Sequence, residues 1–475
     1  MVRPLWTMDE LLEATGGELK GLSPGEITGI SIDTRTLRSG ELYVAIKGDR
    51  LDGHDYVGAA FEAGAGAALV ASDWDGLDDP ANAGHPVIVV ADSLKGMEAI
   101  GRAARRRSVG RIIAVTGSVG KTGTKEALKH CLSQQGICHA AEKSFNNHWG
   151  VPLTLSKMAA DTQFGVFEIG MNHPGEIRPL VGMVRPHVAI ITTVEPVHLG
   201  FFKSVEEIAD AKAEIFEGIE PGGVAVLNRD NAHFERLALR AREVGVGDIQ
   251  TFGAHESCDM RVTHMRLDAS GSDVSATYKG EVINYRLGTA GRHIVQNSLA
   301  VLLGIALAGG DIKRAAAALG DIGPQKGRGE RQLFERAGGD IMIIDESYNA
   351  NPASMRAALE AMAGTPKTEF PRRIAVLGDM LELGTQSGAL HAELAVHIDE
   401  AEIDLVFACG PVMKNLFDAL PDGKKGAYFQ NPDEICASLI DEVRAGDLVM
   451  VKGSLGSRMG PIVAALCEHL NNKNN

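Results

Sequence analysis

Short apolar runs alternate with amphipathic stretches along most of the chain, and this alternation predicts an α/β fold. Polar or glycine-rich turns follow the apolar runs, as is typical of strands buried in a mainly parallel sheet. The predicted strands lie at 29–33, 42–46, 67–70, 87–90, 111–116, 165–171, 187–194, 223–227, 341–345, 374–377, 405–408 and 448–451.

Helices are predicted between these strands. Thr7 and Glu10 form a capping box that begins the first helix, and Gly16 ends it. A helical pattern also follows the strand at 111–116 and stops before Gly136. The remaining helices are predicted at 55–63, 93–107, 295–307 and 461–470.

Two stretches interrupt the alternation and divide the chain. Runs of period two between 250 and 287 indicate an antiparallel insert, and 326–331 has the character of a linker. No G-x-G-x-x-G motif follows the first strand after the linker, so we predict no dinucleotide site. We predict three domains: a small α/β N-terminal domain, a central domain with a phosphate-loop-type, mostly parallel sheet and the antiparallel insert, and a Rossmann-like C-terminal domain. Their ranges are 1–90, 91–328 and 329–475.

The stretch at 111–124 carries the clearest chemistry. An apolar run enters a glycine-rich turn that ends in Gly120-Lys121-Thr122, and a helical pattern follows. In such a unit backbone N–H groups face phosphate oxygens, the lysine reaches the terminal phosphates and the threonine hydroxyl binds Mg²⁺. Val115 replaces the first glycine of the eight-residue signature, so a plain tight turn is the alternative. The predicted nucleotide-binding residues are Thr116, Gly117, Ser118, Val119, Gly120, Lys121, Thr122 and Gly123.

Two further polar residues follow central strands. Glu168 stands near the end of the run at 165–171, and His198 stands four residues past the run at 187–194. Ligands bind outside the carboxyl ends of parallel strands, so we expect both side chains to share a site with the phosphate loop. The alternatives are a solvent-facing carboxylate and a polar loop histidine.

Composition and charge exclude several classes of protein. The 475 residues carry a net charge of −15, which argues against nucleic-acid binding, and the one basic cluster, 102–111, is interpreted as a solvated helix end. The six cysteines are scattered, as in a reducing compartment. Neither a signal core nor an apolar run of membrane-spanning length is present. We therefore expect a cytoplasmic protein without membrane insertion, and a monomer.

The motifs together resemble those of the Mur ligases, the ATP-dependent amide-bond-forming enzymes of bacterial cell-wall precursor synthesis. The turn at 116–122 is similar to the family's short phosphate loop, which accounts for the missing glycine. Leu381 departs from the expected glycine without affecting a catalytic role. The other matching stretches are Asp33-Thr-Arg35, Gly40-Glu-Leu-Tyr-Val-Ala-Ile-Lys-Gly48, Asp52-Gly-His54, Ser144-Phe-Asn-Asn147, Gly150-Val-Pro-Leu-Thr-Leu155, Asp345-Glu-Ser-Tyr-Asn-Ala-Asn-Pro352 and Val376-Leu-Gly-Asp-Met380.

The resemblance implies a reaction and its cofactors. The stretches at 144–147 and 345–352 are most similar to the last-acting ligase, which implies UDP-N-acetylmuramoyl-tripeptide and D-alanyl-D-alanine as substrates. ATP and two Mg²⁺ ions would be required, and the amide would form through an acyl phosphate and a tetrahedral intermediate.

The resemblance also assigns roles to residues. Lys121, Lys212 and His198 are the expected catalytic residues, and Lys212 would be carbamylated. Thr122 and Glu168 would hold one Mg²⁺, and His198 with carbamylated Lys212 would hold the second. The expected ATP contacts outside the loop are Asn297, Arg331 and Asp345. The expected UDP-precursor contacts are Ser31, Asp33, Arg35, Asn146 and Asn147, and the expected dipeptide contacts are Tyr348, Asn349, Asn351, Lys452 and Ser454.

Other functions remain open at this point. A sibling ligase would add diaminopimelate or lysine to a shorter precursor, and the stretches at 144–147 and 345–352 argue against it. Folylpolyglutamate synthetase, a more distant relative, is disfavoured by the UDP-type N-terminal section. The last alternative is a nucleotide-dependent switch, which needs only one Mg²⁺ site and a mobile loop. Such a switch would not explain why Glu168, His198 and Lys212 occur together.

Overall fold

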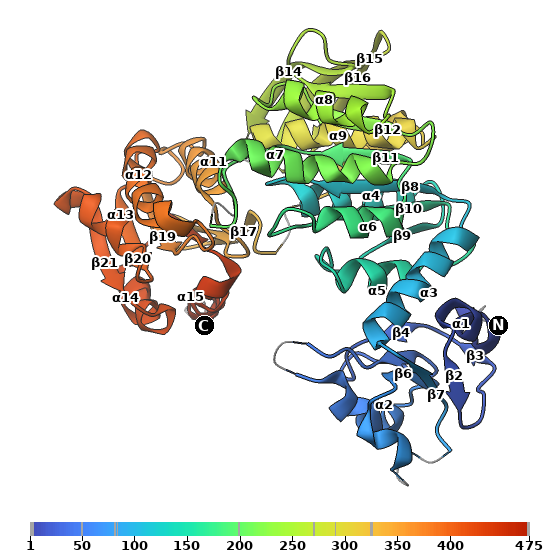
Figure 1. Ribbon diagram of the computed structural model, residues 1–475. Helices are drawn as coiled ribbons and strands as arrows, with labels where there is room; N and C mark the ends of the chain where they lie inside the picture. Colours follow the sequence, from blue (N-terminus) through green and yellow to red (C-terminus); the bar gives the residue numbers. More distant parts are fainter. Residues whose placement is uncertain are drawn as a thin grey trace.

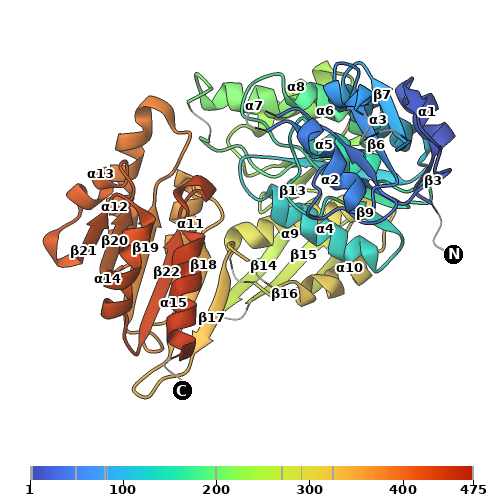
Figure 2. The ribbon, with the colours of Figure 1, turned by 90° about the horizontal axis from the view of Figure 1, so that it is seen from below.

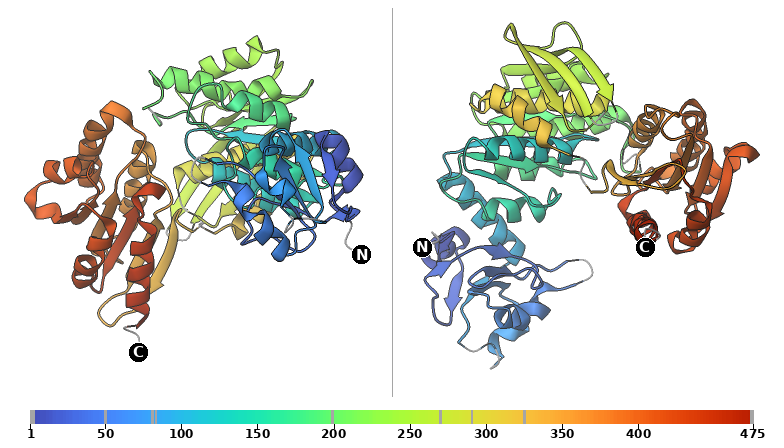
Figure 3. Two further views of the ribbon diagram at one scale, coloured as in Figure 1. Left: turned by 60° about the horizontal axis from the view of Figure 1, so that its bottom comes forward. Right: turned by 180° about the vertical axis from the view of Figure 1, so that it is seen from behind.

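Three lobes follow one another along the chain, each built on its own sheet (Figure 1). The computed structural model describes residues 4–48, 51–79, 82, 84–197, 200–268, 271–289, 291–323 and 326–472. The three main sheets contain five, nine and six strands, and most neighbouring strands are parallel. The N-terminus lies on the first lobe and the C-terminus on the third (Figure 3). The predicted three-part α/β architecture is confirmed.

The first lobe has the strand order β2-β7-β6-β5-β4, in which only β2 is antiparallel to its neighbour. The predicted capping box is present: Thr7 N donates to Glu10 Oε2 at 2.8 Å, and Gly16 ends the helix with φ of 63°. The elements are β1 Trp6–Thr7, α1 Met8–Thr15, β2 Glu18–Lys20, β3 Glu26–Ile27, β4 Ile30–Ser31, β5 Leu42–Val44, α2 Val57–Glu62, β6 Ala67–Ala71 and β7 Val87–Val90.

The second lobe has the strand order β16-β15-β14-β13-β12-β11-β8-β10-β9. Strands β14, β15 and β16 are antiparallel, whereas β13 pairs in parallel with β12. The antiparallel part is therefore smaller than the predicted 250–287, and it extends the main sheet. The strands are β8 Arg111–Thr116, β9 Cys138–Ala140, β10 Phe164–Glu168, β11 Val188–Ile191, β12 Val224–Asn228, β13 Asp248–Gly253, β14 Met260–Asp268, β15 Gly271–Tyr278 and β16 Glu281–Leu287.

Helices cover both faces of this sheet. Alternate residues of β8 pack on opposite sides: Ile112 belongs to the core beneath α3, α5, α6, α7 and α8, and Ile113 to the core beneath α4, α9 and α10. The helices are α3 Ser93–Arg107, α4 Lys121–Ser133, α5 Gly150–Ser156, α6 Ile177–Val184, α7 Val205–Ala213, α8 Phe234–Glu243, α9 Arg292–Leu307 and α10 Ile312–Ala318.

The third lobe has the order β17-β18-β22-β19-β20-β21, with β17 antiparallel at one edge (Figure 2). The predicted linker at 326–331 is only partly a linker, because Glu330 and Arg331 already lie in β17. The elements are β17 Glu330–Phe334, β18 Ile341–Glu346, α11 Pro352–Ala363, β19 Arg372–Gly378, α12 Ser387–Glu400, β20 Leu405–Cys409, α13 Lys414–Ala419, β21 Lys425–Phe429, α14 Ile435–Glu442, β22 Asp447–Lys452 and α15 Gly460–Asn472.

Helix α3 joins the first two lobes into one packed unit. A single hydrophobic cluster extends from Trp6 through Ile100 to Val246, whereas the clusters of the third lobe begin at Phe334. The prediction of a solvated basic helix end is wrong for two arginines. Arg105 is 6% exposed and donates to the carbonyl of Val184 at 2.8 Å, at the end of α6. The Arg107 guanidinium lies 3.4 Å from the centroid of the Trp6 ring.

Among the described residues, no helix combines the length and the apolar character needed to cross a bilayer.

Candidate functional site

The glycine-rich turn connects the end of β8 to the start of α4, and β8 lies between β11 and β10 in the second sheet. Gly117 and Gly120 have φ of 149° and 84°, in the region that favours glycine. A Cβ at Gly120 would lie 2.5 Å from Asn297 Nδ2, and one at Gly117 would lie 2.0 Å from Thr192 Oγ1. The turn can therefore approach its neighbours only as glycine, and Asn297 on α9 lies against it.

The segment after β11 braces this turn. Ser118 Oγ donates to the carbonyl of Glu195 at 3.0 Å and accepts the Glu195 N–H at 2.8 Å. Thr192 Oγ1 donates to the carbonyl of Val119 at 2.6 Å. These contacts were not predicted, because side-chain bonds to backbone groups of a distant loop leave no sequence pattern.

Lys121 begins α4, and its side chain folds back over the turn. Its Nζ donates to the carbonyl of Gly117 at 2.7 Å. Burial lowers the pKa of Lys121, the negative charge of Glu168 opposes that shift, and the charge of Arg328 adds to it. The ammonium therefore lies where the phosphates of a nucleotide would replace its carbonyl contacts.

Glu168, at the end of β10, is the central acid of the site. It is 2% exposed, and its Oε1 accepts hydrogen bonds from Asn146 Nδ2 at 2.7 Å and Thr122 Oγ1 at 3.2 Å. Its Oε2 is buried and accepts no hydrogen bond from any described residue. A buried carboxylate oxygen without a partner beside a threonine hydroxyl fits a hard divalent cation such as Mg²⁺.

The remaining ligands of such an ion would be phosphate or water oxygens. In the described part of the chain, no group of three or more His, Cys, Asp and Glu side chains gathers as a metal cluster. Mg²⁺ commonly keeps several waters and binds through one or two carboxylates together with substrate phosphates. The pair Thr122 and Glu168 matches that requirement.

Lys212, on α7, is 2% exposed and forms no ion pair with a described residue. Burial lowers its pKa well below the ordinary value, and the charge of Lys121 lowers it further. The structure thus places a buried lysine with a lowered pKa near Lys121 of the phosphate loop. The predicted His198 lies outside the described residues.

Arg328 and Tyr348 form the third-lobe side of the site. The Arg328 guanidinium lies 4.3 Å from the centroid of the Tyr348 ring, and its Nη2 is 3.5 Å from Thr122 Oγ1. Asp345 is 5% exposed and accepts the N–H groups of Gly327 at 3.1 Å and Ser347 at 3.0 Å. The predicted Asp345 therefore fixes the loop that carries Arg328, a residue the sequence reasoning missed.

The predicted Arg331 lies elsewhere on this lobe. It lies in β17, where burial lowers its pKa and the charge of Glu346 opposes that shift. Lys452 Nζ donates to Glu346 Oε2, at 3.1 Å.

The predicted dipeptide residues gather at the carboxyl ends of β18 and β22. Lys452 Nζ donates to the carbonyl of Asn349 at 3.1 Å, and Ser454 Oγ donates to the carbonyl of Ala350 at 3.3 Å. The Asn349 residue is exposed. Asn351 caps α11, because its Oδ1 accepts the Ser354 N–H at 2.8 Å.

The predicted UDP-precursor residues come from two lobes: Ser31, Asp33 and Arg35 lie in the first, and Asn146 and Asn147 lie before α5 in the second. Asp33 accepts a two-point contact from Arg35, with Nη2 at 2.7 Å, and Ser31 Oγ donates to the Asp33 carbonyl at 3.1 Å. The Arg35 hydrogen bonds lower the pKa of Asp33, and the charge of Lys143 lowers it further. Asn147 Oδ1, next to Asn146 in the chain, accepts the N–H of Gly150, the first residue of α5, at 2.9 Å.

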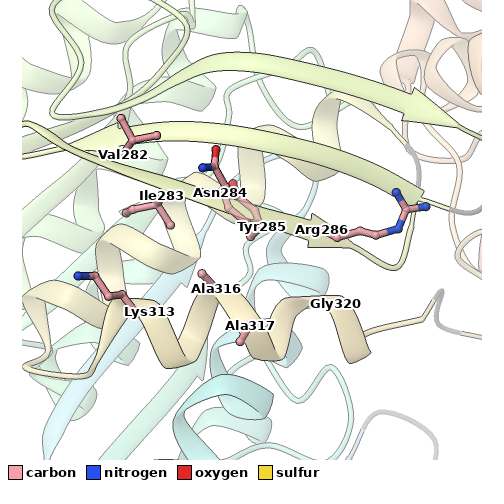
Figure 4. Close-up of a pocket in the computed structure, with 9 residues that line it drawn as sticks. All are labelled: Val282, Ile283, Asn284, Tyr285, Arg286, Lys313, Ala316, Ala317 and Gly320. Atoms are coloured by element: carbon pink, nitrogen blue, oxygen red, sulfur yellow. The ribbon is translucent and has the colours of Figure 1, made fainter.

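A separate pocket lies far from this site. It occupies the space between β16 and α10, and Figure 4 shows Tyr285, Arg286 and Lys313 among its lining residues. Strand β16 is the edge strand of the second sheet and is separated from β8 by five strands. The pocket therefore contributes nothing to the phosphate-loop site.

Comparisons with known proteins identify the family of this chain. Three family models match: the Mur ligase family catalytic domain at residues 26–107, the Mur ligase middle domain at 115–305 and the Mur ligase glutamate ligase domain at 310–455.

Individual relatives match over nearly their whole length. The UDP-N-acetylmuramoyl-tripeptide–D-alanyl-D-alanine ligase of Rickettsia prowazekii is 33% identical, covering 97% of this chain and 99% of the relative. A MurF crystal structure from Acinetobacter baumannii superposes with a TM-score of 0.84 at 30% identity, covering 98% of this chain and 100% of the other. MurF from Thermotoga maritima in complex with ADP gives a TM-score of 0.76 at 25% identity, covering 94% and 98%.

Proposed function

The chain belongs to the Mur ligase family, and we propose that it uses ATP to join D-alanyl-D-alanine to UDP-N-acetylmuramoyl-tripeptide. The product is the pentapeptide precursor of peptidoglycan. The observation that carries the proposal is the buried Glu168, with one unpartnered oxygen, against the Thr122 hydroxyl and the phosphate loop. The identity of the substrates is inferred from the Rickettsia prowazekii relative, whose name states them and which matches 97% of this chain.

The three lobes divide the substrates between them. We assign 1–90 to the UDP end of the precursor, 91–328 to ATP and the reacting groups, and 329–475 to the dipeptide. The Thermotoga maritima relative was solved with ADP, which supports the nucleotide assignment. Cytoplasmic location in a bacterium and a monomeric state belong to the same proposal.

The chemistry explains why the site needs cations. The terminal carboxylate of the tripeptide attacks the γ-phosphorus of ATP, the bond to the bridging oxygen breaks, and ADP leaves. The dipeptide amine then attacks the acyl phosphate, loses a proton, and the tetrahedral intermediate expels phosphate. Lys121 stabilises the negative charge that accumulates on the phosphoryl oxygens.

Two Mg²⁺ positions are proposed. Thr122 and Glu168 would hold the ion that neutralises the ATP phosphates and orients the γ-phosphoryl group. His198 and carbamylated Lys212 would hold the second ion near the acyl phosphate. Lys212 suits the modification because burial lowers its pKa, and a neutral amine that adds CO₂ and releases a proton becomes an anionic carbamate.

The loop that leads into the third lobe, together with residues of that lobe, completes the site. We propose that Arg328 binds the ATP phosphates, because it already reaches Thr122 from a loop that Asp345 holds. Arg331, Asp345 and Asn297 would support the nucleotide from the surrounding elements. Closure of this lobe excludes water, which would otherwise hydrolyse the acyl phosphate.

The contacts to the two organic substrates follow the same division. Ser31, Asp33, Arg35 and Asn146 would bind or face the UDP precursor, and Asn147 would orient the neighbouring loop. Tyr348, Asn349, Lys452 and Ser454 would line the dipeptide site, with Asn351 fixing the turn that presents them.

The test is phosphate release from ATP in the presence of UDP-N-acetylmuramoyl-tripeptide. D-Ala-D-Ala, D-Ala, lysine and diaminopimelate are compared as amines, and the product is weighed by mass spectrometry. We expect release only with D-Ala-D-Ala and a product heavier by that dipeptide. Release with a single amino acid and a shorter precursor would identify a sibling ligase. Release without any amine would identify a nucleotide-dependent switch.

A further inference from the structure

Lys125 is a buried cation that the proposed mechanism does not use. It lies on α4, one turn after the phosphate loop, and its side chain is fully shielded from solvent. Its Nζ donates to the carboxylate of Glu126 and to the carbonyl of Ala141, the latter at 2.9 Å. A buried ammonium is costly unless each of its donors has a partner, so a lysine at this position needs a reason.

The contact to Ala141 connects α4 to a functional loop. Ala141 follows β9, and the chain then runs through Ser144 and Asn146 to α5. Ser144 Oγ lies 3.2 Å from Thr122 Oγ1, and Asn146 Nδ2 donates to Glu168 Oε1 at 2.7 Å. The loop that Lys125 holds at its start therefore orients the carboxylate proposed to bind Mg²⁺.

The same loop also faces the first lobe. Lys143 lies two residues after Ala141, and its positive charge acts on Asp33, in the segment proposed to bind the UDP precursor. The hydrogen bond from Lys125 to the Ala141 carbonyl thus lies at the beginning of this loop. The loop carries Asn146, which contacts Glu168, and Lys143, whose charge acts on Asp33.

We propose that Lys125 is a positioning residue, whose ammonium fixes the loop at 141–147 to the phosphate-loop helix and thereby orients Asn146 and Glu168. The inference deepens the proposed function and rests on it for the identity of the precursor. Its effect on cation binding can be measured without the ligase reaction.

The first experiment compares Lys125→Met with Lys129→Met. Methionine keeps the length of the side chain without the ammonium, and Lys129 is half-buried one turn later on the same helix. Mg²⁺-dependent binding of ADP is measured by calorimetry for both variants. For Lys125→Met we expect the apparent dissociation constant for Mg²⁺ to rise about tenfold, the effect of losing one hydrogen bond to a charged group. Lys129→Met should match the wild type. An unchanged constant in Lys125→Met would overturn the proposal.

A double-mutant cycle tests whether Lys125 acts through Asn146. If it does, Lys125→Met combined with Asn146→Ala weakens Mg²⁺ binding no more than Asn146→Ala alone. Additive losses would overturn the proposed route. If Lys125→Met fails to fold, Glu126→Gln replaces it in both measurements, because it removes the carboxylate partner from a partly exposed position, and the same direction is expected.

Steady-state kinetics supply a third readout. Lys125→Met should raise the KM for UDP-N-acetylmuramoyl-tripeptide several-fold and leave the KM for D-Ala-D-Ala unchanged, because the dipeptide is assigned to the third lobe. Equal changes in the two KM values would contradict the proposal that Lys125 positions the loop at 141–147. A wild-type protein without ligase activity would refute the proposed function alone, since the ADP and Mg²⁺ measurement does not depend on that reaction.

Discussion

The guanidinium of Arg328 stacks on the ring of Tyr348 at 4.3 Å while its Nη2 lies 3.5 Å from Thr122 Oγ1. A single side chain thus contacts both the third lobe and the phosphate loop. Tyr348 restricts the guanidinium before any nucleotide arrives, and a preorganised donor loses less conformational entropy on binding phosphate.

Arg328→Ala should reduce kcat about 10- to 100-fold, the effect of losing a hydrogen bond between charged groups. Arg328→Lys should recover only part of the loss, since an ammonium has no planar fork of donors. Rates of phosphate release and ADP affinity are the measurements. Arg331→Ala is the comparison, because Arg331 lies three residues further along the chain, within β17. A larger loss in Arg331→Ala would transfer the phosphate role to that residue.

Glu168→Gln should abolish most activity and raise the Mg²⁺ requirement, because it removes the negative charge that the cation needs. Asn146→Ala should cost about 10- to 100-fold, as is typical for residues that orient a metal ligand. Magnesium titrations of the initial rate provide the readout. Asn147→Ala is the comparison: it removes the hydrogen bond to the Gly150 N–H, and among the described residues it is Asn146, not Asn147, that donates to Glu168. It should therefore raise the Mg²⁺ requirement less than Asn146→Ala does.

Lys212 should make activity depend on CO₂. Removing dissolved CO₂ and bicarbonate is expected to reduce the rate, and adding bicarbonate should restore it. Because burial lowers the pKa of Lys212, the amine is available well below the pH at which an exposed lysine deprotonates, and restoration should slow as the pH falls and the amine becomes protonated. The rate of recovery is followed between pH 6 and about pH 9, a range that spans neutrality. Full activity after exhaustive CO₂ removal would contradict carbamylation.

His391 should contribute to acid sensitivity of the third lobe. Its Nε2 accepts the Met380 N–H at 2.9 Å, and burial lowers its pKa. The unfolded state, with a pKa near 6.5, therefore binds more protons, and the free energy of unfolding falls as the pH drops below about 6.5. His391→Gln keeps a donor and an acceptor without the titration, so its stability should vary less between pH 7 and about pH 5. Identical pH slopes in the two proteins would refute the assignment.

The hydrophobic pattern predicted strands that are buried on both faces better than it predicted strands at the edges of the sheets. The edge strands β17 and β21 were not predicted, because β17 reads Glu-Arg-Gln-Leu-Phe and has only one buried position. An edge strand exposes one face and one row of backbone groups, so its sequence needs no apolar run.

The site residues were predicted well where one short motif contains them, as in the phosphate loop. They were predicted less well where residues close together in the sequence have different roles that only the folded structure distinguishes. Asn146 and Asn147 are adjacent, yet one donates to Glu168 and the other accepts the N–H of Gly150 at the start of α5. Arg328 and Arg331 are three residues apart, and only the start of β17 decides which of them reaches Thr122. Lys125 carries no motif that points to the loop, since its partner there is the backbone carbonyl of Ala141.

The continuous core beneath α3 affects how the three lobes unfold. Trp6 and Val246 belong to one hydrophobic cluster, and Arg105 ties α3 to the end of α6, whereas the third lobe keeps separate clusters. The first two lobes should therefore melt as a single cooperative unit and the third lobe as another. A nucleotide bound between Thr122 and Arg328 would contact both units. A saturating ATP analogue should therefore bring the two calorimetric transition temperatures closer together.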